Sequence, residues 1–285
     1  SLVGSEMCIR DRFCGWRLMK IILNGKPFET QYLRLFEIRD KYFDSACITI
    51  LNGFQTSENL TVKDGDIVSI IKKGVMPPKE ELESLMAARH TPKVHDTVKK
   101  ARVAVCGLGG LGSNIAVMLA RTGVGYLKLI DFDIVEPSNL NRQSYYVEHL
   151  GMFKTDALKE QIKRINPFIE VCCETDKITD ENCAQLLSDC DIICEAFDNP
   201  ETKAMLTERT LSDFPDKKLV CGSGMAGFES SNKIVTKKIM KNLYICGDGE
   251  SEARPGNGLM APRVSVCAGH QANMILRLIM ENEEP

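Results

Sequence analysis

The stretch ARVAVCGLGGLG, residues 101–112, decides the fold of this chain. It opens with alternating β-branched residues, runs into Gly107, Gly109 and Gly112, and is followed by apolar side chains at helical spacing up to Thr122. This pattern predicts a strand, a tight glycine turn and a helix N-terminus. Such a turn lets the backbone approach phosphate oxygens, and the free N–H groups of the helix N-terminus bind them. The stretch therefore predicts a nucleotide site.

The residues that follow strengthen this prediction. A second apolar strand, predicted over 126–130, ends at Asp131, about twenty residues beyond the turn, where a ribose-binding acid is expected. A glycine loop with an acid at this distance fits NAD as well as ATP. An NAD-dependent oxidoreductase therefore stays open on these residues alone.

Composition is that of an ordinary soluble globular protein. The chain has 285 residues, 44% of them apolar and 26% charged, with a net charge of -3. There is no basic excess that would indicate nucleic acid, and no apolar run of about 18 residues that would indicate a membrane span.

Twelve cysteines are scattered through apolar segments, and no pair has the C-x-x-C spacing of a zinc knuckle. Cys267 and His270 could share a helix face, but two ligands do not make a metal site. Reduced, buried thiols in a cytoplasmic protein are the favoured interpretation.

The N-terminal part divides into a leader and a small domain. Residues 1–18 have no secretory signal pattern and are expected to be a non-native leader, with Met19 as the native start. From 19 to 76 the pattern is strand, strand, helix, strand, strand, with Asn-Gly turns. The paired LNG turns and VKDGDIVSIIKKG resemble the sulfur carrier ThiS, which implies a β-grasp, ubiquitin-like domain.

The end of this domain departs from such carriers. They react through a free C-terminal Gly-Gly carboxylate, whereas here Lys72, Lys73 and Gly74 lead into Pro77-Pro78 and the chain continues. The domain is therefore not expected to be a substrate as it stands. A docking, occluding or regulatory role and a purely structural role both remain open.

The rest of the chain predicts an α/β fold. Residues 77–100 are expected to be a linker with a helix over 80–89. From 101 to 285, strands near 101–106, 126–131, 168–173, 190–195 and 217–222 alternate with helices, and short strands, a glycine-rich loop at 247–258 and an apolar helix over 263–280 follow. This alternation predicts a Rossmann-like, mostly parallel sheet with helices on both faces.

A polar cluster follows the second strand of this fold. The segment FDIVEPSNLNRQ carries Asn139 and Arg142, Lys154 begins the next helix, and Asp198-Asn199 closes the strand IICEAF. Ligands of open α/β sheets bind at the carboxyl edge of the strands, where these residues are expected. Cationic groups and a carboxylate there suit phosphate chemistry with magnesium.

These motifs together resemble the ThiF/MoeB/HesA family, relatives of the ubiquitin-activating enzymes. The resemblance rests on GLGGLGSN, LIDFDIVEPSNLNRQ, residues 151–154 and FDN at 197–199, and covers roughly residues 80–280. It implies an adenylyltransferase that uses ATP and Mg²⁺ to activate the C-terminal glycine of a ThiS-type sulfur carrier ending in Gly-Gly, in thiamine thiazole synthesis. It also implies a homodimer.

The resemblance assigns roles to individual residues. The phosphates of ATP would be held by Gly107, Gly109, Gly110, Gly112, Asn139 and Arg142. Asp131 would bind the ribose, Lys154 would neutralise charge on the α-phosphate, and Asp198 would bind Mg²⁺. Arg89 is the candidate for an arginine that family members insert into the partner subunit's ATP site.

Two departures from the family limit what is implied. The two C-x-x-C pairs of the family's zinc site are missing, so no structural zinc is expected. Arg254 stands near the position of a cysteine that some relatives link to the carrier; Cys246 could replace it, although burial at a strand end is favoured. Adenylation is therefore better supported than sulfur transfer, and a catalytically silent scaffold is a third interpretation.

Overall fold

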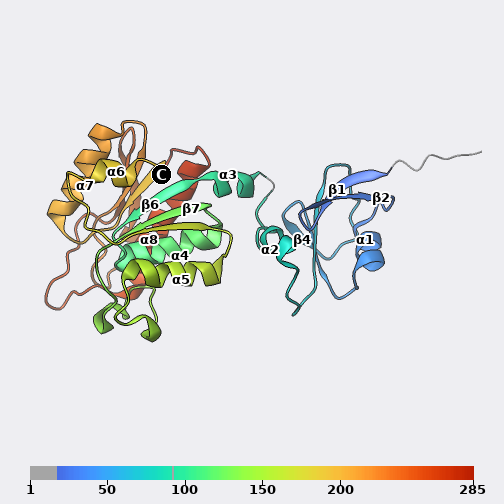
Figure 1. The fold of residues 1–285 in the computed structure, drawn as a ribbon, viewed down its shortest axis with the longest axis horizontal. Coiled ribbons are helices and arrows are strands. Elements are labelled where there is room, and N and C mark those ends of the chain that lie inside the picture. Colours follow the sequence, from blue (N-terminus) through green and yellow to red (C-terminus); the bar gives the residue numbers. More distant parts are fainter. Residues whose placement is uncertain (1–17, 92) are drawn as a thin grey trace, which may run out of the picture. The chain divides into compact units, whose positions relative to one another are not determined.

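A computed structural model describes residues 18–91 and 93–285, which belong to two separate compact units, the second beginning at residue 93. The first unit is a five-stranded sheet in the order β2-β1-β5-β3-β4 with two helices (Figure 1). The strands are β1 (Met19–Leu23), β2 (Lys26–Thr30), β3 (Ile48–Leu51), β4 (Phe54–Thr56) and β5 (Ile67–Ile71), and the helices are α1 (Leu35–Tyr42) and α2 (Lys79–Met86).

One face of this sheet packs on α1. Leu35 and Ile38 of α1 are fully buried in a cluster with Val68 and Ile70 of β5. The two Asn-Gly turns place Asn24 and Asn52 at φ values of 48° and 51°, a left-handed conformation that asparagine tolerates and that hairpin turns require. The sequence pattern therefore produces the predicted β-grasp.

The opposite face of the same sheet is covered by the residues that follow β5. Ile50 pairs with Ser69 on that face, and each is only 2% exposed. In the turn between β1 and β2, Asn24 donates a hydrogen bond to Glu81 of α2 over 3.1 Å. In the turn between β3 and β4, a side chain on Gly53 would come within 3.1 Å of the backbone at residues 90 and 91. The helix of the expected linker therefore belongs to the β-grasp unit.

The second unit is a seven-stranded sheet in the order β11-β12-β10-β9-β6-β7-β8, parallel except for β11. Its strands are β6 (Arg102–Cys106), β7 (Tyr126–Ile130), β8 (Glu170–Glu174), β9 (Ile192–Glu195), β10 (Lys218–Gly222), β11 (Val235–Met240) and β12 (Leu243–Gly247). Its helices are α3 (Val94–Lys100), α4 (Gly110–Thr122), α5 (Lys154–Ile165), α6 (Cys183–Leu187), α7 (Pro200–Asp213) and α8 (Ala261–Ile279), with short 3-10 turns η1 (Pro137–Asn139), η2 (Val147–His149) and η3 (Ser231–Lys233).

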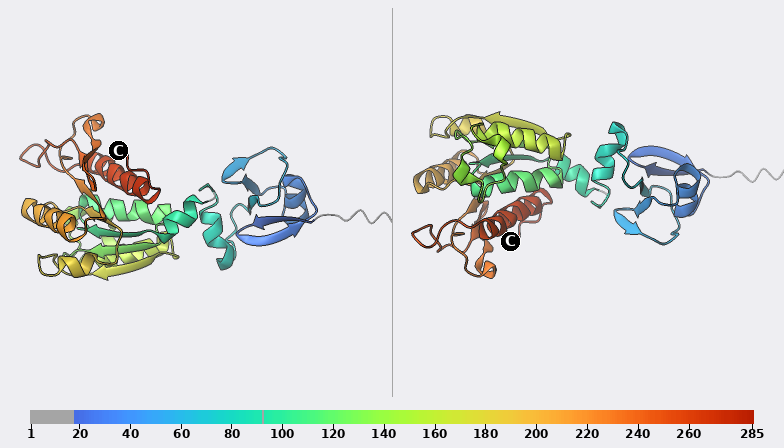
Figure 2. Two further views of the ribbon diagram at one scale, coloured as in Figure 1. Left: turned by 90° about the horizontal axis from the view of Figure 1, so that it is seen from above. Right: turned by 90° about the horizontal axis from the view of Figure 1, so that it is seen from below.

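Helices cover both faces of this sheet. Residues of α4, α5 and α8 form one buried cluster with the sheet, and residues of α6 and α7 form a second on the other face. Figure 1 and the two views in Figure 2 show these layers. The Rossmann-like fold preceded by a β-grasp is thus confirmed.

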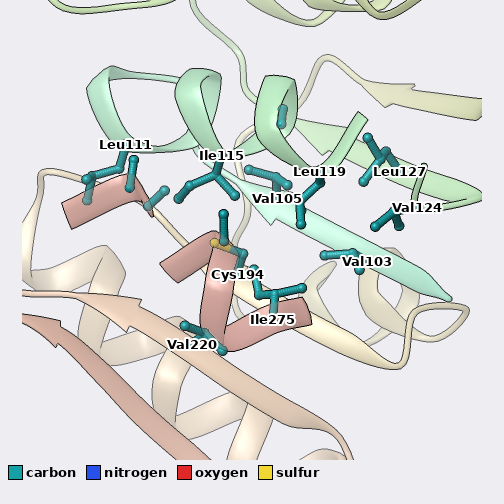
Figure 3. Close-up of a cluster of buried hydrophobic side chains, with 14 of the residues drawn as sticks. Val103, Val105, Leu111, Ile115, Leu119, Val124, Leu127, Cys194, Val220 and Ile275 are labelled. Atoms are coloured by element: carbon teal, nitrogen blue, oxygen red, sulfur yellow. The ribbon is translucent and has the colours of Figure 1, made fainter. Parts of the chain in front are cut away.

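The core lies around the central strand β6. Val103 and Val105 are fully buried against Ile115 and Leu119 of α4, and Figure 3 shows these side chains facing one another across the cluster. Beyond them lies Ile275 of α8, also fully buried. The strand before the glycine turn and the helix after it are therefore fixed by apolar packing.

The structure adds elements that sequence reasoning missed and moves others. β4 and α3 were not predicted, and the final helix α8 begins at Ala261 rather than at residue 263. The proposed leader lies outside the described residues except for Leu18. Within the described part of the chain, no helix combines the length and apolar character needed to cross a membrane.

Candidate nucleotide and metal site

The order of strands creates a binding edge beside β6. From β6 the chain runs outward to β7 and β8, then returns to β9 on the other side of β6. Parallel sheets bind ligands at the carboxyl ends of strands where the winding direction reverses. The glycine loop follows β6, Asp131 follows β7, and Asp198 follows β9, so the structure brings the three predicted segments to one edge.

The glycine loop is fixed by contacts that exclude side chains. Gly107 has φ +88°, and a Cβ there would lie 2.9 Å from the carbonyl oxygen of Ala196. A Cβ on Gly112 would lie only 1.8 Å from the carbonyl oxygen of Gly107. Gly109 precedes α4, and the atom nearest to a Cβ placed on it is Nε2 of Gln143, at 3.9 Å. Gly107 and Gly112 are therefore closely packed against neighbouring backbone, whereas the space beside Gly109 is open to a ligand.

Asp131 lies directly under this loop. Its Oδ2 accepts a hydrogen bond from the N–H of Leu108 over 2.6 Å, and its Oδ1 accepts one from the N–H of Asp133 over 2.8 Å. Burial raises the pKa of Asp131, and Lys154 and the two N–H groups oppose that rise. This carboxylate orders the glycine loop, and its expected contact with a ribose stays a prediction.

Asp133 is a site residue that sequence reasoning missed. Lys154 is 6% exposed, and its Nζ donates to Oδ2 of Asp133 over 2.8 Å. A backbone bridge between Ile134 and Phe153 brings the two residues together. The only signal in the sequence was that Asp133 is the second acid of the motif DFD. Sequence reasoning assigned the first acid, Asp131, to the ribose and gave Asp133 no role.

Arg142 and Gln143 present polar atoms to the same edge. Arg142 donates through Nη1 to the carbonyl of Ser138 over 3.1 Å and to Asn141 over 2.9 Å. Its buried Nε, and the buried Oε1 of Gln143, have no hydrogen-bond partner within the described ranges. Such atoms are costly unless a ligand or water satisfies them. Together with the open Gly109, the Nε donor of Arg142 fits a phosphate oxygen, whereas Oε1 of Gln143 is an acceptor and fits a hydroxyl group or a water.

Asn139 is held as part of the scaffold of this segment. It is 9% exposed, and its Oδ1 accepts a hydrogen bond from the N–H of Glu136 over 3.0 Å. This hydrogen bond closes the short turn η1. It therefore fixes the backbone conformation of the segment that leads to Arg142. Direct contact of Asn139 with a phosphate stays a prediction.

Asp198 is the residue that fits a metal. It is exposed at the end of β9, and Asn199 caps α7 by accepting a hydrogen bond from the N–H of Thr202 over 2.8 Å. Mg²⁺ is commonly held by one or two carboxylates together with substrate phosphates and water. A single exposed carboxylate that follows β9, at the edge where the glycine loop follows β6, is compatible with this mode. No cluster of three or more His, Cys, Asp or Glu residues is found among the described residues.

The remaining predicted residues have the following contacts, and the expected role of Arg89 in a partner's site stays a prediction. Arg89 is in the first unit, where its guanidinium donates to the side-chain oxygen of Gln55. Cys246 is fully buried, and burial raises its pKa to about 11. His270 contacts Thr236 through Nδ1 over 3.0 Å, while Cys267 donates to the backbone of Cys246, so these two do not form a metal pair.

Comparison with known families assigns both parts of the chain. The model of the ThiF family matches residues 83–285, and a model described as ThiS-like ubiquitin matches residues 19–74. The resemblance seen in the sequence is thereby confirmed.

Curated relatives carry names that describe their activity. The chain is 30% identical over 201 residues to "Adenylyltransferase and sulfurtransferase UBA4" of Candida glabrata, a match that covers 66% of this chain and 46% of that protein. It is 35% identical over 129 residues to "Adenylyltransferase and sulfurtransferase MOCS3" of Drosophila willistoni, covering 45% of this chain and 28% of that protein. The chain thus spans less than half the length of these relatives.

Solved structures share the fold. The E. coli tRNA N6-threonylcarbamoyladenosine dehydratase TcdA, in complex with ATP, has a TM-score of 0.65 and 24% identity, and the match covers 73% of this chain and 98% of that one. E. coli MccB with AMPCPP and MccA has a TM-score of 0.54 and 22% identity, covering 72% of this chain and 64% of that one. At these identities the likeness concerns the fold.

Proposed function

We propose that this chain, which belongs to the ThiF family, adenylates the C-terminal carboxylate of a ubiquitin-like sulfur-carrier protein with ATP. The observation that carries the proposal is the convergence of a glycine loop, buried Lys154 and exposed Asp198 at one edge of the sheet, beside Arg142, whose buried Nε donor lacks a partner within the described residues. The relatives' names, which include adenylyltransferase, support the same reaction.

The reaction is a displacement at phosphorus. A carboxylate oxygen of the carrier's terminal glycine attacks the α-phosphorus of ATP, and a new oxygen–phosphorus bond forms. The bond from the α-phosphorus to the bridging oxygen breaks, and pyrophosphate leaves with the electron pair. The product is an acyl-adenylate. This step needs positioning and charge stabilisation more than covalent help from the protein.

Each residue of the site has a task in this step. Backbone N–H groups at the start of α4 and the side chain of Arg142 bind phosphate oxygens. Asp131 accepts hydrogen bonds from the ribose hydroxyl groups. Lys154, released from Asp133, neutralises charge that develops on the α-phosphate. Asp198 would hold Mg²⁺, which would supply positive charge to offset the negative charge of the phosphates.

The proposed substrate is a ThiS-type carrier with a C-terminal Gly-Gly. This choice of substrate is supported by the presence of a ThiS-like unit and a ThiF-type unit in the same polypeptide. Thiamine thiazole synthesis is the pathway proposed for this carrier. A cytoplasmic homodimer, with Arg89 reaching the partner's site, completes the proposal.

ATP–pyrophosphate exchange tests the reaction directly. Protein starting at Met19 is assayed with Mg²⁺, with and without a separate ThiS-type carrier that ends in Gly-Gly. Exchange should require the carrier and fall by about 10²–10³-fold in Arg142→Ala. Arg164→Ala serves as the matched control because this arginine lies on the surface of α5, paired with Glu148 over 3.3 Å.

The outcomes separate the competing functions. Carrier-dependent exchange that is lost in Arg142→Ala and kept in Arg164→Ala supports the adenylyltransferase. ATP binding without exchange, for any carrier ending in Gly-Gly, would favour the silent scaffold. Binding of NAD in preference to ATP would favour the oxidoreductase.

A further inference from the structure

An ion pair with a fully buried carboxylate lies at the base of the loop that carries Asp198. Glu195, the last residue of β9, has no exposed surface, and its two carboxylate oxygens lie 2.9 and 2.7 Å from Nζ of Lys203 in α7. The same Glu195 accepts a hydrogen bond from the N–H of Phe197 over 2.7 Å. The ion pair therefore joins the two ends of the segment 195–203, which contains Asp198.

Lys203 connects this loop to a third segment. Its Nζ also donates to the carbonyl of Phe197 over 3.3 Å and to the carbonyl of Gly222, at the end of β10, over 2.8 Å. Behind the pair, Gln271 of α8 donates to the carbonyl of Glu195 over 3.0 Å. One ammonium group therefore joins the ends of β9 and β10 to the start of α7.

The loop in turn contacts the phosphate loop. A Cβ on Gly107 would lie 2.9 Å from both the carbonyl oxygen of Ala196 and the ring of Phe197. The residue that precedes Asp198 thus rests on the first glycine of the nucleotide turn. A shift of residues 196–198 would change the distance between the proposed metal ligand and the phosphates.

We propose that Lys203, through Glu195, is a positioning residue that holds Asp198 in the place where it would bind Mg²⁺ together with ATP. The inference rests on the proposed function in that Asp198 is taken as the metal ligand. It adds Glu195 of β9 and Lys203 of α7, to which sequence reasoning assigned no role in the site. Groups that orient a ligand in this way commonly change metal affinity by about 10–100-fold when removed.

The test measures how much Mg²⁺ tightens the binding of ATP. Calorimetric titration of the whole chain with ATP, once in EDTA and once in Mg²⁺, gives two dissociation constants, and their ratio is the coupling between metal and nucleotide. The variant Glu195→Gln with Lys203→Met removes both charges together, which avoids leaving one buried charge unpaired. The coupling ratio should fall by about tenfold, while affinity in EDTA stays within about threefold.

A matched control lies at the other end of β9. Lys128 is 6% exposed, pairs with Asp189 and donates to the carbonyl of Leu186 over 2.9 Å. Lys128→Met with Asp189→Asn removes the same two charges and a similar bond, and should leave the coupling unchanged. The conservative Lys203→Arg, for which the adjoining cavity of about 460 Å³ gives room, should retain it.

Each result decides the matter. Coupling that persists in a folded Glu195→Gln, Lys203→Met chain, or that falls equally in the control, overturns the proposal. If that chain does not fold, Lys203→Gln, which keeps a donor without the charge, carries the same measurement. Mg²⁺ coupling in wild type without carrier-dependent exchange would sink the proposed reaction while leaving this inference standing; no Mg²⁺ coupling in wild type would overturn the inference.

Discussion

Nζ of Lys154 lies 2.8 Å from Oδ2 of Asp133, and the N–H of Lys154 donates to the carbonyl of Asp133 over 2.9 Å. The ammonium is buried while the side chain of Asp133 is half exposed, so the carboxylate is the more accessible member of the pair. An anionic ligand at this edge can therefore share or replace Asp133 as the partner of Lys154.

Asp133→Asn tests whether this contact orients the ammonium group of Lys154 toward the α-phosphate. The amide oxygen can still accept a hydrogen bond but lacks the charge, so we expect carrier-dependent exchange to fall by about tenfold. Lys154→Ala, which removes the charge itself, should cost about 10²–10³-fold. Exchange is measured at saturating ATP, with Glu148→Gln, an acid exposed on the same segment, as control. A faster Asp133→Asn enzyme would contradict the aiming role and indicate competition with phosphate.

Two glycines in helices should respond oppositely to alanine. At Gly112 a Cβ would collide with the carbonyl of Gly107 at 1.8 Å, whereas a Cβ at Gly269 in α8 would meet no atom within 4 Å apart from its chain neighbours and the nearby backbone of its own helix. Gly269→Ala should raise the free energy of unfolding by about 0.5–1 kcal/mol, because alanine favours a helix. Gly112→Ala should lower it by about 3 kcal/mol through overpacking. Urea denaturation of both variants provides the check, and equal effects would argue against the tight turn.

The ion pair between Asp248 and Arg263 should make stability depend on pH. Desolvation would raise the pKa of Asp248, but the N–H groups of Ser251 and Glu250 and the guanidinium of Arg263 outweigh it and lower the pKa to about 2. Because the folded pKa is below the unfolded value of about 3.9, the stabilisation is present above pH 4 and is lost as pH falls toward 2.

Asp248→Asn should therefore destabilise the protein by about 2 kcal/mol at pH 7, and the difference from wild type should shrink in acid. Urea denaturation at pH 7, 5 and 3 measures it. Glu229→Gln is the control, since Glu229 pairs with Lys233 on the surface, where ion pairs contribute about 0–1 kcal/mol. A difference that stays constant down to pH 3 would show that the charge of Asp248 is not what stabilises the fold.

The thiol of Cys246 should be inert in the native protein. It is fully buried and its pKa is raised to about 11, so little thiolate forms near neutral pH. Iodoacetamide at pH 8 should leave Cys246 unmodified until urea is added, as read by mass spectrometry of its peptide. Cys246→Ser should keep carrier-dependent exchange within about twofold. Rapid native labelling would reopen Cys246 as a partner for the carrier.

Sequence reasoning found the elements with strong local signals. The strand and glycine turn at β6 and α4 follow from β-branched alternation and glycine spacing, and Asp131 follows from its distance to that turn. β4 escaped because it is three residues long, and α3 because Val98 is its only buried residue. Both lack the periodicity on which such predictions depend.

Contacts between distant segments were harder to foresee. Asp133 meets Lys154 across 21 residues only because Ile134 bridges to Phe153. Glu195 and Lys203 are eight residues apart, a spacing that matches neither strand nor helix pairing. Asp133 and Lys203 act by orienting another residue, and such residues are identified from contacts in the folded structure rather than from a sequence motif.

The packing of α2 on the β-grasp sheet has a consequence for how the two modules can be recombined. The ThiF family match begins at residue 83, yet the first compact unit extends to residue 92, so about ten residues belong to both. A deletion that ends at residue 76 would leave Glu81 and Ala88 without the sheet they cover, whereas one that ends at residue 92 removes the unit whole. Exchange of the N-terminal module between homologues is therefore expected to succeed only when residues 79–91 travel with it.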